Sequence, residues 1–459
     1  MKKVHFLIGI NIVILITAFI FASLYHVREP PAERIIMPLA WGVVIAFAWM
    51  VLSWYLATKS IFDPYILFLV AAFLFNGGFA LLLVGPFGEE VPLLDFFNLE
   101  NVFTYRQISD TFLLVLISLL SFHFGALVNF IKPNKISRNI NEYKNKKTHL
   151  LKKQMQTGWM LFILSLIPTV VLLYKGVRYA SLYGYKEGWI QRFDVSAPIR
   201  ILSGFFLPGI LYLIASSKRR WFSLMISVNS LFLFSIGYFF IGARRFAVSA
   251  LLAGAWTWDR SIKKLPKLLL LISGFSILFL VLPFITFYRQ SPGISALTNE
   301  SVLIFLDYYS KLIIIIRETL LEIGRTSKVI TYTLELVPEV RPFAKGQSYI
   351  NALVSIFPNL FWDVHPTAQH NLSQWFVNTK FPGFANQGGG FGFSFIAEAF
   401  LNFGWLGAPI ILAVFGFLYA RFVLWAVTSI HPLKVATVAS FLYFFLLFAR
   451  GESYSLPRY

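Results

Sequence analysis

The sequence contains no cysteine among its 459 residues. This absence excludes disulfides, thiolate nucleophiles and metal sites built from cysteine. Charged residues are also scarce, at 13% of the chain, which is roughly half of the share usual in soluble proteins. Internal repeats, low-complexity tracts and the motifs of P-loop enzymes, dinucleotide-binding enzymes, serine hydrolases and zinc proteases are missing as well. These absences point away from the common soluble enzyme classes.

Apolar residues are abundant instead, at 57% of the chain, and the mean hydropathy is +0.69. They gather into stretches long enough to cross a bilayer, which takes about 20 residues each. The first stretch exceeds the apolar core of a signal peptide, about 7–15 residues, and is interpreted as a retained span. The sequence thus predicts an all-α polytopic membrane protein with about eleven transmembrane helices. The expected spans are Val4–Tyr25, Ile36–Ala57, Pro64–Gly85, Asp110–Phe130, Thr157–Tyr174, Pro198–Ser216, Phe222–Ile241, Phe246–Trp258, Leu268–Tyr288, Trp405–Phe422 and Val435–Phe448.

The distribution of charge predicts the orientation of these spans. The net charge is +19, which in a soluble protein would suggest nucleic acid as a partner. Here the basic clusters lie in short loops, before the first span and after the fourth, sixth, eighth and tenth spans. The positive-inside rule places all of them in the cytoplasm. We therefore expect a multi-pass inner-membrane protein, with membrane lipids and no nucleic acid among its partners.

The longest segment on the opposite, outer side is residues 289–404, within a single membrane domain that covers residues 1–459. Unstructured loops longer than about 12–15 residues are uncommon, and this one is too aromatic and apolar for disorder. Ser301–Ile323 has helical periodicity, with leucines and isoleucines between charged residues. We expect a long helical extracytoplasmic loop, with amphipathic helices that lie over or dip into the outer face.

Two adjacent arginines break the charge rule on this outer side. Arg244 and Arg245 lie between the seventh and eighth spans, where Phe222–Trp258 leaves only about 37 residues for two crossings of about 20 each. Their guanidinium groups must therefore lie at or inside the outer membrane boundary. Charges at that depth are costly and usually mark a function or a partner. Snorkelling to lipid phosphates is the simpler alternative.

Further cations on the outer side are interleaved with aromatic residues. Arg178 and Arg192 lie in the loop after the fifth span, among three tyrosines and a tryptophan. Arginine binds phosphate through two parallel hydrogen bonds, and aromatic faces can stack on sugar rings. The loop therefore suits a phosphorylated, sugar-bearing ligand, and a solvated loop at the membrane surface is the alternative. Arg289 and Arg341 are cations of the long loop.

Glu398 is the only acidic residue in the apolar stretch 390–405. A lone acid there is either held by an arginine or has a raised pKa. The first state would orient a cationic site, and the second would supply a general base. A helix cap or a structural ion pair is the alternative. His370 is a second candidate base, and together with His365 and Asp363 it gives only a weak metal signal. We expect no metal and no other cofactor.

Three short motifs carry a resemblance to a known family. Gly346-Gln347-Ser348-Tyr349, with the following Ile356–Trp362, resembles one stretch of the Wzy-type polysaccharide polymerases. Gly392–Gly407, the block that contains Glu398, resembles a second stretch, and Gly242–Arg245 resembles their glycine–arginine turn between two central spans. The order of the motifs and the topology are similar over nearly the whole chain.

The resemblance implies a membrane glycosyltransferase that polymerises undecaprenyl-diphosphate-linked oligosaccharide repeat units into O-antigen, capsular polysaccharide or exopolysaccharide. Its active site would face the periplasm or the cell exterior. The growing chain would be the donor, its lipid diphosphate would leave, and a hydroxyl of the next unit would attack the anomeric carbon.

The candidate residues fit that demand. Arg244 and Arg245 would stabilise the leaving diphosphate, and Glu398 or His370 would accept the proton of the attacking hydroxyl. The glycine-rich run 388–392 would let the backbone approach a bulky glycan. The expected substrate-binding residues are Arg178, Arg192, Arg289, Arg341, Ser348, Tyr349 and Arg450.

Members of this family usually have another span after the position of Arg450. The odd number of expected spans here leaves the C-terminus outside, so either a twelfth span follows in the full-length form or the chain ends here. A chain-length regulator protein is an expected partner. Other interpretations stay open: an O-antigen ligase that uses the same kind of donor, a flippase for the lipid-linked oligosaccharide, or a scaffold without chemistry.

Overall fold

The computed structural model describes residues 2–86, 103–131, 140–185, 188, 191, 194–217, 220–290, 303, 307, 312–357, 371–386, 390–429 and 431–455. The description is limited to the backbone at residues 2, 140–150, 288–290 and 455. Several predicted site residues therefore lie outside the described residues. They are Arg192, Asp363, His365, His370 and the first two glycines of the run 388–392.

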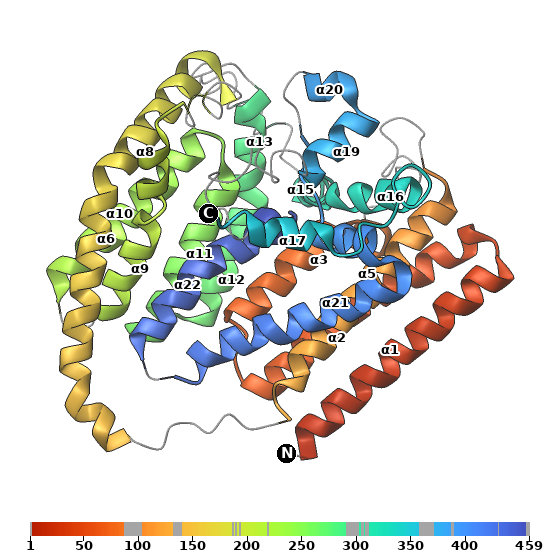
Figure 1. Ribbon diagram of the computed structural model, residues 1–459, viewed down its shortest axis with the longest axis horizontal. Coiled ribbons are helices and arrows are strands. Elements are labelled where there is room, and N and C mark those ends of the chain that lie inside the picture. The colour runs from red at the N-terminus through yellow and green to blue at the C-terminus, as the bar shows by residue number, and fades with distance from the viewer. Residues whose placement is uncertain are drawn as a thin grey trace. The chain divides into compact units, whose positions relative to one another are not determined.

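The described residues form helices and no strand, which confirms the predicted all-α class. The helices are α1 (Lys2–Arg28), α2 (Ala32–Thr58), α3 (Pro64–Val84), α5 (Tyr105–Val128), α6 (Ile140–Tyr183), α8 (Ala197–Ser203), α9 (Phe206–Ser216), α10 (Trp221–Phe240), α11 (Arg244–Ser261), α12 (Lys267–Ser276), the π-helix η1 (Ile277–Val281), α13 (Leu282–Gln290), α15 (Leu312–Gly324), α16 (Thr326–Leu336), α17 (Gln347–Val354), α19 (Leu372–Lys380), α20 (Pro382–Asn386), α21 (Phe395–Val427), α22 (Pro432–Phe448) and the 3-10 helix η3 (Ser453–Ser455). Figure 1 shows their course.

Every expected span overlaps one of these helices, and nine helices of the described part are long and apolar enough to cross a membrane. The helix α21 is interrupted at Gly404, whose backbone is not helical, so the tenth expected span, which starts at Trp405, coincides with the part of α21 after this kink. The amphipathic helix expected over Ser301–Ile323 is present from Leu312 as α15, and most of the residues before Leu312 lie outside the described part.

The chain divides into two compact units, each built from segments distant in sequence. Unit 1 contains Met1–Asn134, Leu320–Leu424 and Phe444–Tyr459, and unit 2 contains Lys135–Thr319 and Trp425–Tyr443. The helices α16, α17, α19 and α20, which lie within residues 289–404, belong to unit 1 together with most of α21, whereas Arg244 and Arg245 belong to unit 2. The two units are therefore described separately.

In unit 1, α2, α3 and α5 pack on one another, and α21 crosses α5 closely. Gly125 of α5 faces the backbone of Ala413, and Gly416 of α21 faces the backbone of Phe122, so that a Cβ at either glycine would collide with main-chain atoms. Small residues allow this approach, as is common between membrane helices. The Asn129 side chain adds a hydrogen bond of 2.9 Å to the Phe417 carbonyl. These contacts fix the position of α21, which carries Glu398.

In unit 2, α6 packs along α9, and α10 and α11 form a tight hairpin. Gly242 occupies the left-handed region (φ 76°), which is the conformation that glycine adopts without strain, and it turns the chain between α10 and α11. Arg244 and Arg245 are the first two residues of α11. The tight turn expected from the short spacing is therefore present, and the two arginines stand at a helix N-terminus.

Candidate functional site

The N-terminal end of α21 positions Glu398. The Ser394 hydroxyl accepts hydrogen bonds from the backbone N–H groups of Ile396 (3.1 Å) and Ala397 (3.3 Å), which caps the helix. The same hydroxyl donates to Asn76 Oδ1 of α3 at 2.6 Å. Because Asn76 is fully buried in unit 1, this bond ties the start of α21 to the helix core. Glu398, in the first turn, is only 1% exposed.

Uncharged donors surround the Glu398 carboxylate. Oε1 accepts from the hydroxyls of Ser348 (2.7 Å) and Ser453 (2.6 Å), and Oε2 accepts from the Ser453 backbone N–H (2.6 Å). Asn402, one turn further along α21, donates to the Ser348 hydroxyl at 2.7 Å and accepts from the Gly346 N–H at 2.9 Å. The carboxylate therefore joins α17, α21 and η3, and it is held by hydroxyl and amide groups instead of an arginine.

A second buried carboxylate lies close to the first. Glu452 is 5% exposed and accepts from the backbone N–H groups of Leu372 (2.8 Å) and Ser373 (3.1 Å), at the N-terminus of α19. Burial, and after it the negative charge of Glu398, raise the pKa of Glu452 to about 7, although the two N–H groups and Arg341 act in the opposite direction. Two buried acids are therefore close to Ser453: Glu398 accepts its hydrogen bonds, and Glu452 precedes it in the chain. The pKa of Glu452 lies where the carboxyl changes protonation near neutral pH.

Sequence reasoning did not select Glu452. The only signal was an acid directly after the last apolar span, in Arg450-Gly451-Glu452. Such an acid is ordinarily a solvated residue at the end of a span. Its burial depends on α19, which lies about 80 positions earlier in the chain.

A family profile of the O-antigen polysaccharide polymerase Wzy matches residues 9–459 of the chain. The chain belongs to the O-antigen polysaccharide polymerase Wzy family. No curated protein and no solved structure matches. The family assignment confirms the resemblance predicted from the three motifs, and it establishes a multi-pass membrane protein that polymerises lipid-linked oligosaccharide repeat units.

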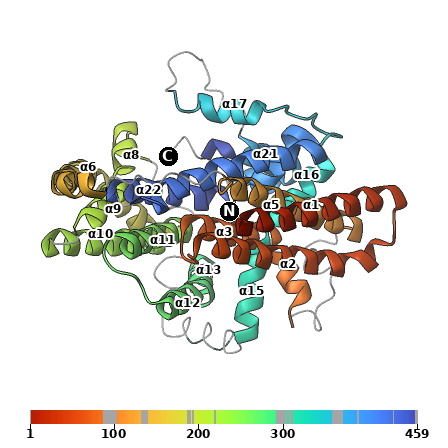
Figure 2. The same ribbon diagram turned by 90° about the horizontal axis from the view of Figure 1, so that it is seen from below.

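The structure brings several of the predicted site residues of this polymerase together in unit 1. Ser348 bonds Glu398 directly. Tyr349 packs between Phe403 (ring centroids 6.2 Å apart) and Phe415 (5.2 Å) of α21, and Figure 2 shows α17 lying over α21. The Tyr349 hydroxyl is buried without a hydrogen-bond partner in the described part of the chain. Burial raises the pKa of Tyr349 well above its ordinary value, and the charge of Glu398 adds to the rise.

Arg341 and Arg450 also belong to unit 1. The Arg341 guanidinium lies 4.6 Å from the centre of the Trp375 ring of α19, and its burial lowers its pKa while Glu452 raises it. The Arg450 side chain reaches the Phe391 carbonyl at 3.5 Å. Gly392 has a positive φ of 76° and lies against the Arg450 backbone carbonyl. Gly392 therefore allows close packing against Arg450. The prediction that the glycine-rich run lets the backbone approach a glycan is a separate role and stays a prediction.

The other predicted residues within the described part belong to unit 2. Arg178, in the last turns of α6, belongs to unit 2, and the described part of Arg289 is its backbone in α13. Arg244 donates to the Leu282 carbonyl at 3.1 Å and to the Thr286 hydroxyl, and the Arg245 guanidinium lies 4.9 Å from the Phe246 ring. The described residues contain no group of three or more His, Asp or Glu side chains able to hold a metal ion. Metal independence stays a prediction.

Proposed function

We propose that this polymerase joins undecaprenyl-diphosphate-linked oligosaccharide repeat units on the outer face of the bacterial inner membrane. The growing chain is the donor. The bond between its anomeric carbon and the diphosphate oxygen breaks, and undecaprenyl diphosphate leaves with the electron pair. A hydroxyl oxygen of the next unit forms the new bond to that carbon, and its proton passes to a carboxylate of the enzyme.

The observation that carries this proposal is the hydrogen-bonded Glu398 carboxylate. An ionised carboxylate only accepts hydrogen bonds, and three donors aim at Glu398 in the structure. A sugar hydroxyl presents the same O–H donor as Ser348. We infer that the attacking hydroxyl donates a hydrogen bond to the Glu398 carboxylate in the same way, and that Glu398 then accepts its proton. His370 is the alternative base.

The diphosphate half of the reaction is assigned to arginines. Arg244 and Arg245 begin α11, where the backbone N–H groups of a helix N-terminus add positive potential. Cations held in place before the reaction stabilise the charge that develops on a leaving diphosphate. Arg178, Arg192 and Arg289 are proposed to bind the carriers or the sugars.

The basic clusters before the first span and after the fourth, sixth, eighth and tenth spans all fall on one side of the membrane, which the positive-inside rule makes the cytoplasm. This supports an outer-face position for residues 289–404, which fall on the other side. The proposal includes Arg341, Ser348, Tyr349 and Arg450 as substrate-binding residues, no metal, and a chain-length regulator as a partner protein.

The test uses the purified protein in lipid nanodiscs with undecaprenyl-diphosphate-linked repeat units as the only substrate. We expect a ladder of polymers, which neither a flippase nor a scaffold would produce. Glu398→Gln should abolish the ladder, because the amide cannot accept the proton. Glu335→Gln is the matched control, since Glu335 is an exposed acid of α16 paired with Lys380. A normal ladder from a correctly folded Glu398→Gln variant would remove Glu398 from the mechanism.

A further inference from the structure

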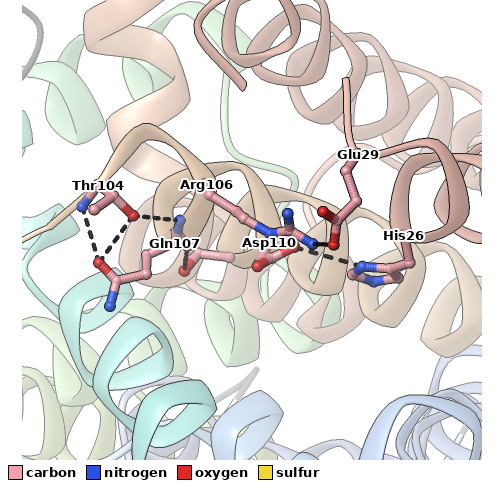
Figure 3. A network of polar contacts seen from close by, with 7 residues as sticks. His26, Glu29, Thr104, Arg106, Gln107 and Asp110 are labelled. Atoms are coloured by element: carbon pink, nitrogen blue, oxygen red, sulfur yellow. Dashed lines mark hydrogen bonds and ion pairs between the residues drawn. The ribbon is translucent and has the colours of Figure 1, made fainter. Parts of the chain in front are cut away.

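Two groups of polar side chains in unit 1 differ in how far they are exposed. One group joins the end of α1 to the start of α5, where Arg106 donates to Glu29 at 2.9 Å and Thr104 caps α5 (Figure 3). The two ion-paired side chains are 45% and 63% exposed, and an exposed ion pair of this kind adds little stability. The other group surrounds Asn76 of α3, which is fully buried and has both polar atoms of its side chain hydrogen-bonded.

Asn76 is an isolated polar residue within an apolar helix. From Ile66 to Val84, α3 contains no other polar side chain. An amide within a membrane-spanning helix is costly unless its hydrogen bonds are made, and such residues commonly join helices or serve a function. The Nδ2 group donates to the Ala72 carbonyl, one turn earlier in α3, at 2.8 Å. The other two bonds of the side chain leave α3 and reach the two segments that form the Glu398 site.

The side-chain amide bridges the start of α21 and the chain just after α22. Oδ1 accepts from the Ser394 hydroxyl at 2.6 Å, and Nδ2 donates to the Ala449 carbonyl at 3.0 Å. Because a carbonyl oxygen only accepts, the nitrogen of the amide must face Ala449, which leaves its oxygen for Ser394. A single planar group thus fixes the spacing of two segments that are far apart in the sequence.

Each of these segments continues into one side of the Glu398 site. Glu398 lies one helical turn after Ser394, and its backbone N–H donates to the Ser394 carbonyl at 2.8 Å. Ser453 follows shortly after Ala449 in the chain and donates its N–H and hydroxyl to the Glu398 carboxylate. The contact between Glu398 and Ser453 is therefore set by where Asn76 holds the two segments.

Aromatic contacts bring the same segments to α3. The Arg450 guanidinium lies 5.8 Å from the centre of the Phe75 ring. The ring of Phe395, at the start of α21, packs on Phe68 of α3 at 5.7 Å and on Phe448 of α22 at 5.5 Å. Ring contacts tolerate sliding, whereas hydrogen bonds have a narrow range of distance and angle. The amide bridge is therefore the more exact of the two constraints.

We propose that Asn76 is a positioning residue of this polymerase. By holding Ser394 and Ala449 at a fixed spacing, it brings the Ser453 donors to the Glu398 carboxylate. Because Asn76 is fully buried, it acts through these neighbours and not on the substrate. The inference rests on the proposed function, in which Glu398 accepts the proton of the attacking hydroxyl, and it adds a residue of α3 outside the motifs that carry the family resemblance.

The experiment measures polymerisation by the purified protein in nanodiscs over a range of pH. Asn76→Ala should lower kcat per folded protein about tenfold, the effect of losing one good hydrogen bond, and leave KM unchanged. The acidic limb of the pH–rate profile should move to higher pH by about one unit, because the ionised Glu398 carboxylate loses donors that stabilise it. Glu452 and Tyr349, the titratable groups that interact electrostatically with Glu398, are unchanged in this variant.

Two fully buried serines donate to Asn76 and provide a matched pair of further variants. Ser394→Ala removes the bond to the side-chain oxygen and should repeat the effect of Asn76→Ala. In the double variant the combined loss should be smaller than the product of the single losses. Ser327 of α16 donates to the backbone carbonyl of Asn76 at 2.7 Å, so Ser327→Ala should lower stability without moving the pH–rate profile. If Asn76→Ala fails to fold, the two serine variants carry the same test.

Unchanged pH dependence in Asn76→Ala and Ser394→Ala, with the same rate as Ser327→Ala, would overturn the inference. Hydrogen exchange at the Ser453 N–H is a readout that needs no activity. It should be faster in Asn76→Ala than in Ser327→Ala, because this N–H loses its fixed acceptor.

The outcomes separate this inference from the proposed function. A normal ladder from Glu398→Gln would contradict the proposed proton acceptor. Faster exchange at Ser453 together with slower polymerisation in Asn76→Ala would then still support positioning by Asn76, whereas unchanged exchange would overturn it.

Discussion

Glu398 and Ser453 lie 55 positions apart in the sequence, and Ser453 donates both its backbone N–H and its hydroxyl to the Glu398 carboxylate, each at 2.6 Å. Ser453 also stands directly after Glu452. The short 3-10 helix η3 thus brings two buried carboxylates close to each other. Glu398 is in the first turn of α21, and Glu452 accepts hydrogen bonds from the N-terminus of α19. The surroundings of Glu398 give a prediction for its partner Ser348, and the burial of Glu452 gives a prediction for the dependence of stability on pH.

Removing the Ser348 hydroxyl should reduce polymerisation without unfolding the protein. Ser348→Ala takes away one donor to Glu398 and leaves Asn402 without the acceptor at 2.7 Å. The loss of a hydrogen bond to a charged group is worth about 1.5–3 kcal/mol, so we expect the rate of polymer formation to fall at least about tenfold. Ser355→Ala is the control, because Ser355 follows α17 and bonds only a local carbonyl, that of Ala352, at 2.6 Å. A normal rate in Ser348→Ala would show that this hydroxyl does not prepare Glu398 for catalysis.

The stability of the protein should depend on pH through Glu452. The carboxyl has an ordinary pKa of 4.5 when unfolded and of about 7 when folded. Between these values the folded protein holds a proton that the unfolded chain has released, so stability is full below about pH 4.5 and falls as the pH rises to 7. The difference amounts to up to about 3 kcal/mol.

The measurement compares thermal unfolding in one detergent at pH 5 and pH 8. The wild-type protein should lose stability at pH 8 relative to Glu452→Gln, which has no proton to release. Parallel curves for the wild-type and variant proteins across this range would contradict the raised pKa.

The crossing of α5 and α21 should not tolerate a methyl group. Gly416→Ala or Gly125→Ala places a Cβ against backbone atoms that cannot move aside, and overpacking of this kind costs about 1–3 kcal/mol or more. We expect a clear fall in the midpoint of thermal unfolding. Gly9→Ala in α1 is the control, since nothing lies within 4 Å of the added Cβ; it should be neutral or slightly stabilising. Unchanged stability in both crossing variants would mean that the two helices are further apart.

Replacing the two arginines of the α10–α11 hairpin should stop chain growth. In cells that contain the Arg244→Ala, Arg245→Ala double variant at normal protein level, single lipid-linked repeat units should accumulate and long polymer should be lost, as gel analysis of the glycans would show. Arg245→Lys is expected to retain partial activity, because lysine keeps the charge but lacks the two-pronged geometry. Full-length polymer from the double variant would exclude these residues from diphosphate binding.

The sequence by itself determined the all-α membrane architecture, because a span needs about 20 apolar residues and such runs are visible in any one segment. It also determined the family, through the blocks around Ser348 and Glu398, and the tight turn before Arg244, which follows from the spacing of two spans. These features depend on residues that are close together along the chain.

Only the tertiary structure decided what surrounds the candidate residues. The sequence offered an arginine as one possible partner of Glu398, whereas the structure gives it serines from α17 and from the C-terminal end. Glu452 became a candidate only because the N-terminus of α19 covers it. Burial and hydrogen bonding between segments separated by tens to hundreds of residues depend on how the helices pack, and the local pattern of any single segment carries no record of that packing.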